Sequence, residues 1–167
     1  VLSQKSSEFC AIVTLGFQSS EPNKGFPYCY DFSVCYTLTA TSLTVEVFIS
    51  NTDTKEFPFT LGWHPYFYTS DLEQSFLNFV SSHKIQFDAN LITDSLIPYE
   101  ELMPFVVADK QLDDSFVLKT DTVAFTTPDY KLEVKTNTQE NYLQVYTPEN
   151  RNEIAIEPMT GISESFN

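Results

Sequence analysis

Apolar and polar residues alternate with a period of two in several separate segments of this 167-residue chain. Side chains that alternate in this way point to opposite faces of a β-strand, so one face can be buried while the other meets solvent. No segment shows a convincing 3.6-residue period, and turn residues such as Thr127-Pro128-Asp129 separate the runs. The sequence therefore predicts an all-β fold, a large antiparallel β-sandwich. The apolar positions are Phe32, Val34, Tyr36 and Leu38; Leu43, Val45, Val47 and Ile49; Leu132 and Val134; Leu143 and Val145; and Ile154 and Ile156.

Length and composition narrow the class of protein. A chain of 167 residues suits one domain with its own core, so a single domain over residues 1–167 is predicted. The net charge of −14, from 23 acidic and 9 basic residues, makes contact with nucleic acid or an anionic membrane surface unfavourable. No apolar run approaches the roughly 18 residues of a membrane span. The three cysteines lack the spacings of a zinc or redox motif, so we interpret them as reduced thiols, which favours the cytoplasm.

A histidine in an aromatic segment is the first candidate for chemistry. His64 is one of two histidines and stands between Trp63 and Pro65-Tyr66-Phe67. Aromatic rings around a titratable group suit a site that handles sugars. The alternative is a turn histidine bonded to a backbone carbonyl. The other histidine, His83, follows two serines and is interpreted as a surface loop residue without a role.

The last predicted strands place polar side chains on one face. If Ile154 and Ile156 point into the core, alternation turns Glu157 to the opposite face. The same reasoning turns Gln144 away from the core, together with the tyrosines on either side of it in that strand. Were the two strands neighbours, these groups would share a polar and aromatic surface like that of a sugar cleft. The alternatives are that Glu157 is a solvated strand residue and Gln144 an exposed amide.

Six further blocks follow one another along the chain: Gly25-Phe26-Pro27-Tyr28, Leu43-Thr44-Val45-Glu46, Phe57 to Phe67, Leu112 to Phe116, Leu143 to Thr147 and Ile156 to Gly161. In this order they resemble the blocks of one family, the aldose 1-epimerases, or mutarotases, of the galactose mutarotase type. The resemblance implies a galactose mutarotase-like supersandwich and matches the second half of a mutarotase domain. We therefore expect an incomplete sandwich that lacks the N-terminal strands and the last strand, with the protein's own N-terminal fragment as an expected partner.

The resemblance implies interconversion of α and β anomers of free hexoses through ring opening, without a metal or cofactor. By position, Glu157 resembles the family's base and His64 its acid. Asp113 resembles the carboxylate that binds sugar hydroxyls, and Gln144 the amide that lines the cleft. The choice of Asp113 over Asp114 depends on the alignment, and this acidic pair could instead cap a turn.

The aromatic residues beside the histidine complete the predicted site. Trp63 and Tyr66 are expected to contact the sugar, which is the expected small-molecule partner. Galactose mutarotases carry a further histidine and an arginine for which this chain has no counterpart. A hexose-6-phosphate mutarotase is an alternative, but it would need clustered basic residues and Arg151 is the sole arginine. A non-catalytic carbohydrate-binding domain is the second alternative.

Overall fold

β-Strands joined by loops and turns make up the part of the chain that the structure describes. A computed structural model covers residues 1–22, 24–100 and 102–166, and within these ranges it contains no helix. All of the strand pairs are antiparallel, so the predicted all-β antiparallel fold is confirmed. The chain consists of two compact units, Val1–Pro58 and Phe59–Asn167. The single domain predicted for residues 1–167 stays a prediction.

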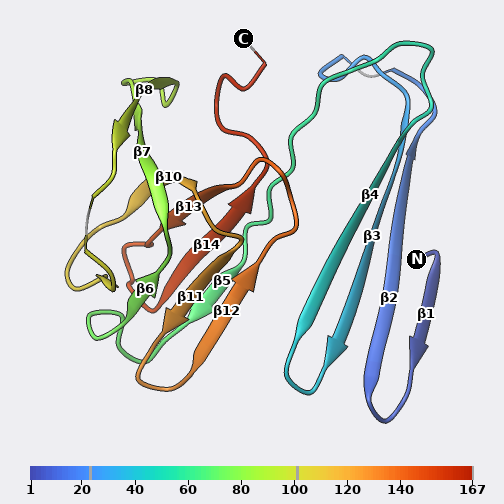
Figure 1. The fold of residues 1–167 in the computed structure, drawn as a ribbon. Coiled ribbons are helices and arrows are strands. Elements are labelled where there is room, and N and C mark those ends of the chain that lie inside the picture. Colours follow the sequence, from blue (N-terminus) through green and yellow to red (C-terminus); the bar gives the residue numbers. More distant parts are fainter. Residues whose placement is uncertain (23, 101, 167) are drawn as a thin grey trace. The chain divides into compact units, whose positions relative to one another are not determined.

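The first unit, Val1–Pro58, is one four-stranded sheet in which each strand pairs with the next along the chain. The register places Phe32 opposite Phe17 on one neighbour and Ile49 on the other. The apolar residues of the predicted alternation therefore gather on one face of this sheet. The strands are β1 (Ser3–Ser6), β2 (Cys10–Ser19), β3 (Tyr30–Thr39) and β4 (Leu43–Asn51), drawn in blue to teal in Figure 1.

The three cysteines all belong to this first unit. Cys10, Cys29 and Cys35 are unpaired and half-buried. The interpretation as free thiols agrees with the structure, although none of the three is fully buried.

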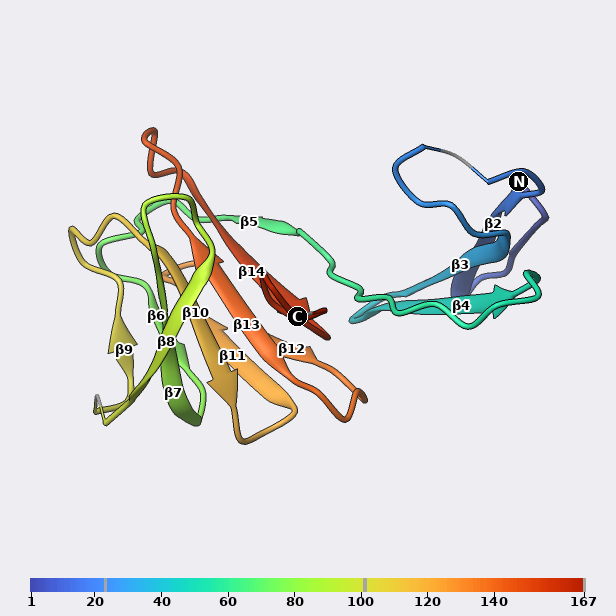
Figure 2. The same ribbon diagram turned by 90° about the horizontal axis from the view of Figure 1, so that it is seen from above.

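The second unit, Phe59–Asn167, contains two further sheets. A six-stranded sheet has the order β5 (Tyr66–Tyr68), β14 (Glu153–Met159), β13 (Tyr142–Tyr146), β10 (Asp113–Leu118), β7 (Ser81–Phe87) and β8 (Thr93–Pro98). A four-stranded sheet has the order β12 (Lys131–Lys135), β11 (Thr122–Thr126), β6 (Phe76–Asn78) and β9 (Phe105–Val106). Figure 2 shows β14, β13 and β10 side by side, so strands distant in sequence share the larger sheet.

The core of the second unit draws its side chains from both of these sheets. Phe116, Leu143 and Ile156 from the larger sheet belong to one buried cluster with Leu77 and Phe125 from the smaller sheet. Complete burial of each such side chain contributes about 1.5–3 kcal/mol. Because side chains alternate along a strand, the other face of the larger sheet is left for the neighbouring positions, and the candidate site lies there.

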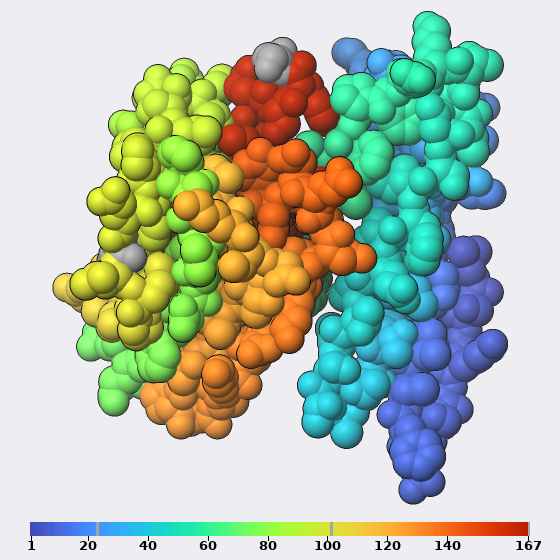
Figure 3. Space-filling model, in the orientation of Figure 1, coloured from blue at the N-terminus to red at the C-terminus, as the bar shows by residue number. Residues whose placement is uncertain are grey.

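Two local features fix the ends of strands in this unit. The predicted turn at residues 127–129 joins β11 to β12, and the Thr127 hydroxyl accepts the backbone N–H groups of Asp129 at 3.1 Å and Tyr130 at 3.0 Å. After β14 the chain reaches the start of β8, where Thr93 N–H donates to Ser163 Oγ at 3.0 Å and Thr93 Oγ1 donates to the Ser163 carbonyl at 2.8 Å. Figure 3 shows the C-terminal segment (red) against this region (yellow-green) at the surface.

None of the described residues belongs to a helix long and apolar enough to cross a bilayer.

Candidate active site

Strand pairing places Glu157 of β14 opposite His64, which lies two residues before β5. Tyr66 of β5 pairs with Ala155 of β14, and the same register continues before β5, where Gly62 pairs with Met159. His64 lies midway between these two pairs and is therefore opposite Glu157. The two residues are more than ninety positions apart in the sequence, and the sheet alone makes them neighbours.

The side chains of this pair are in direct contact. His64 Nε2 lies 3.1 Å from Glu157 Oε1, and the imidazole is 53% exposed whereas the carboxylate is 11% exposed. The Tyr66 ring lies beside the imidazole, with ring centroids 4.9 Å apart and planes at 31°. The site therefore combines a nearly buried carboxylate with an imidazole that solvent can reach.

The surroundings of Glu157 change its proton affinity. Burial raises the pKa of the Glu157 carboxyl above its ordinary value, the His64 charge lowers it, and the Asp113 charge raises it. The net direction is upward. A carboxylate with a raised pKa is a stronger base when it is ionised, which suits proton abstraction.

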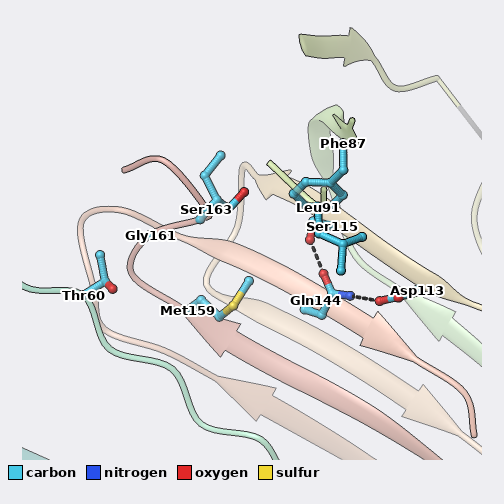
Figure 4. Close-up of a pocket in the computed structure, with 10 residues that line it drawn as sticks. Thr60, Phe87, Leu91, Asp113, Ser115, Gln144, Met159, Gly161 and Ser163 are labelled. Carbon is cyan, nitrogen blue, oxygen red and sulfur yellow. Dashed lines mark hydrogen bonds between the residues drawn. The ribbon is translucent and has the colours of Figure 1, made fainter. Parts of the chain in front are cut away.

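Gln144 and Asp113 lie beside this pair on the same face of the sheet. Gln144 is opposite Glu157 in the pairing of β13 with β14, and Ser115 is opposite Gln144 in the pairing of β10 with β13. Gln144 Nε2 donates to Asp113 Oδ1 at 2.6 Å, and Ser115 Oγ donates to Gln144 Oε1. Figure 4 shows both hydrogen bonds, one at the oxygen and one at the nitrogen of the Gln144 amide. Together they fix this amide in one orientation.

A cavity of about 310 Å³ opens over these polar groups. Asp113, Ser115 and Gln144 are polar residues of its lining that lie on the sheet, and Phe87 and Met159 are among its apolar residues. A volume of this size lies at the lower end of the range for small-molecule sites. The other lining residues are Thr60, Leu91, Gly161, Ile162 and Ser163. His64 and Glu157 do not line the cavity. Glu157 lies opposite Gln144, which does line it.

Five of the six residues predicted for the site share this face of the sheet. They are His64, Tyr66, Asp113, Gln144 and Glu157. The sixth, Trp63, is half-buried, and its backbone N–H donates to the Pro158 carbonyl at 3.1 Å. A contact of the Trp63 ring with the sugar stays a prediction.

The structure also separates the two adjacent aspartates. Asp113 lies on the face with Ser115, whereas Asp114 lies on the face with Phe116 and forms an ion pair with Lys84 at 2.7 Å. Only Asp113 lines the cavity. The register thus supports the alignment that selected Asp113.

Ser115 was not identified from the sequence. Its signal was the period-two spacing from Asp113, which places both residues on one face of a strand. In the described part of the chain, no group of three or more His, Cys, Asp or Glu side chains is arranged to hold a metal ion.

Comparisons with known proteins agree with the predicted resemblance. The family model for aldose 1-epimerase matches residues 2–167 of this chain. YihR, an uncharacterized protein of Escherichia coli K12, is 27% identical over 158 residues, which is 87% of this chain and 51% of YihR. The chain therefore spans about half the length of this curated relative.

Solved structures of similar proteins share the fold. The Slr1438 protein of Synechocystis sp. PCC 6803 matches with a TM-score of 0.80 and 23% identity, over 99% of this chain and 56% of that one. A galactose mutarotase-like protein of Lactobacillus casei ATCC 334 matches with a TM-score of 0.75 and 22% identity, over 99% of this chain and 63% of that one. At these identities the likeness establishes the fold, a mutarotase-like sandwich.

Proposed function

This chain belongs to the aldose 1-epimerase family, and from that premise we propose that it takes part in the interconversion of the α and β anomers of free hexoses such as galactose or glucose. The observation that carries the proposal is the contact of 3.1 Å between His64 Nε2 and Glu157 Oε1, next to a cavity lined by Gln144 and Asp113. An acid and a base that meet at one site are the groups that this reaction requires.

The proposed reaction needs two proton transfers in opposite senses. Glu157 removes the proton of the anomeric hydroxyl, and protonated His64 gives a proton to the ring oxygen. The electron pair that the departing proton leaves on O1 forms the C1=O1 double bond of the aldehyde, and the C1–O5 bond breaks with its pair going to O5, which takes the proton from His64. Rotation about C1–C2 followed by reclosure returns both protons and yields the other anomer. When His64 is protonated, its ion pair with Glu157 already holds both groups in the starting charge states.

Substrate binding requires the two side chains to separate. The imidazole is 53% exposed and the carboxylate 11% exposed, so His64 has more freedom to move than Glu157. We propose that the sugar enters between them, with the acid moving and the base staying in place. The hydroxyl groups then reach Gln144 and Asp113, and an apolar face of the ring meets the apolar wall at Met159.

The charges around the cavity favour a neutral sugar over a sugar phosphate. Among the residues that the structure describes, those that line the cavity include Asp113 and no lysine or arginine. Arg151, the sole arginine, donates to the backbone carbonyls of Lys110 at 2.7 Å and of Ala108. A phosphate would meet a carboxylate without a cation to pair with it, so a free hexose is the preferred substrate class.

The length of the relatives bears on the complete site. Because the chain spans 51% of YihR and 56–63% of the two solved structures, we propose that the active protein contains further sequence or binds it as a separate fragment. Native mass spectrometry of the protein from its natural source tests this. A mass equal to that of the 167-residue chain alone would contradict it.

The experiment that tests the activity is polarimetry of freshly dissolved α-D-galactose. The wild-type protein is expected to speed the approach to equilibrium, and Glu157→Gln to bind galactose without doing so. Glu153→Gln is the matched control, since it removes a carboxylate from the same strand and face. Relaxation no faster than buffer, with galactose still bound by the wild type, would reject the epimerase and favour a carbohydrate-binding domain.

A further inference from the structure

A short chain of hydrogen bonds ends at the two predicted sugar ligands. Ser115 Oγ donates to Gln144 Oε1, and Gln144 Nε2 donates to Asp113 Oδ1 at 2.6 Å. The direction of each bond follows from chemistry. An ionised Asp113 can only accept, so the amide nitrogen must face it, the amide oxygen must face Ser115, and the serine must be the donor.

Ser115 is placed for this role by the middle of the larger sheet. It lies opposite Gln144 on β13 and opposite Ile85 on β7, so strands on both sides hold its backbone. The residue is only 1% exposed, which leaves little room for water to replace its hydroxyl. Gln144 itself is half-buried and its hydrogen bond with Ser115 is partly buried, so an amide oxygen that lost this donor would lose part of its stabilisation.

We propose that Ser115 is a positioning residue for sugar binding, because it locks the Gln144 amide with its nitrogen toward the cavity and toward Asp113. This inference rests on the function proposed above. The Gln144 nitrogen has a second hydrogen, and Asp113 has a second oxygen. The wall therefore offers one donor and one acceptor next to each other. A sugar hydroxyl, which both accepts and donates, satisfies the two together, whereas a methylene or an ether oxygen does not.

Replacing Ser115 with alanine tests this role. The two side-chain amide protons of Gln144 are followed by NMR, and KM and kcat are measured by polarimetry with α-D-galactose. In Ser115→Ala the Gln144 amide protons are expected to move toward the shifts of a free amide. KM is expected to rise about fivefold to tenfold, with kcat changed by less than about twofold, because the acid and base remain. Ser115→Thr, which keeps the hydroxyl, is expected to restore both readouts.

A second buried serine serves as the matched control. Ser75 is 0% exposed, and its hydroxyl donates to the Asp71 carbonyl at 2.7 Å away from the site. Ser75→Ala is expected to lower stability while leaving KM and the Gln144 amide protons unchanged. If Ser115→Ala does not fold, Ser115→Cys replaces it, since a thiol has similar volume and is a weaker donor.

The outcomes separate this inference from the proposed function. Gln144 amide protons that keep their wild-type shifts in folded Ser115→Ala would overturn the inference, whatever the activity. An unchanged KM in that variant would also overturn it. A wild-type protein without epimerase activity would instead reject the proposed function. In that case the Gln144 shifts and the dissociation constant for galactose, measured in the same titration, still decide whether Ser115 positions the amide.

Discussion

Replacing Glu157 with glutamine is expected to stabilise the protein at neutral pH. Only 11% of the Glu157 side chain is exposed, so folding removes an ionised carboxylate from most of its water. Its one ion-pair partner, His64, is 53% exposed, and a pair of this kind contributes about 0–1 kcal/mol. Glutamine has nearly the same shape, can still hydrogen-bond to the imidazole and does not carry the charge.

The size of the effect follows from these two opposing contributions. Effective penalties for fully buried ions reach several kcal/mol, and Glu157 keeps some contact with solvent and a partner. We therefore expect Glu157→Gln to gain about 1 kcal/mol at pH 7–8. For a chain of 167 residues this corresponds to a rise of about 3 °C in Tm.

The gain in stability from Glu157→Gln must increase as the pH rises. Because the folded protein raises the pKa of Glu157, the folded state holds this proton more tightly than the unfolded chain does. The stability that Glu157 contributes is therefore fully present below the ordinary pKa of a glutamate. It is lost as the pH rises through the higher folded-state pKa. The advantage of Glu157→Gln should be smallest near pH 4 and grow until Glu157 is fully ionised in the folded state.

Thermal unfolding followed by circular dichroism from pH 4 to pH 8 measures this difference. Glu153→Gln is again the matched control and is expected to show no such growth with pH. The reasoning is refuted if Glu157→Gln is no more stable than the wild type at pH 8, or if its advantage shrinks as the pH rises.

Three further predictions concern catalysis and the core. His64→Asn is expected to reduce kcat about 100-fold. It is also expected to move the acidic limb of the pH–rate profile to higher pH, since the imidazole charge lowers the pKa of Glu157. An acidic limb at the wild-type pH would contradict this. Asp113→Asn should raise KM about tenfold and move the acidic limb to lower pH, because the Asp113 charge raises the pKa of Glu157. Asp114→Asn should leave KM and the acidic limb unchanged in the same assay, since Asp114 pairs with Lys84. Ile156→Ala should destabilise the protein by about 3 kcal/mol, seen as a lower urea midpoint, because its side chain is 0% exposed; a loss below about 1 kcal/mol would count against the assigned core.

The strands that carry Glu157 and Gln144 could be predicted from the sequence. Ile154 and Ile156 alternate with Glu157, and Leu143 alternates with Gln144, so each strand has one apolar and one polar face. The structure buries the apolar positions and pairs Gln144 with Glu157 across neighbouring strands. Local periodicity was sufficient to predict the face of each residue here, because one face of each strand packs into the core and the other does not.

The contact of His64 with Glu157 could not be derived in the same way. Periodicity gives the face of a residue but not the strand that pairs with it, and the contact of His64 with Glu157 depends on the register of β5 with β14. Strands β6 to β9 were also indistinct in the sequence, since their apolar runs are short and depend on contacts with distant strands.

The one-residue ambiguity at the acidic pair shows why a register is needed. Asp113 and Asp114 have the same chemistry, and no composition argument separates them. The pairing of β10 with β13 places Asp113 opposite Tyr146 and Asp114 opposite Val145. Once that register is known, the face of Ser115 follows too, and a buried serine two residues after a cavity carboxylate becomes informative.

The position of each group within the larger sheet has a consequence for how the site works over time. Among the described residues, β5 lies at one edge of this sheet beside β14, which has a strand on each side. Because edge segments open locally at a lower free-energy cost than interior strands, we expect the backbone around His64 to open more readily than that around Glu157. In the proposed reaction, this difference makes the proton donor more mobile than the proton acceptor. The proposed site would then open and close around each successive sugar by motion of the segment that carries His64, while Glu157 stays in place.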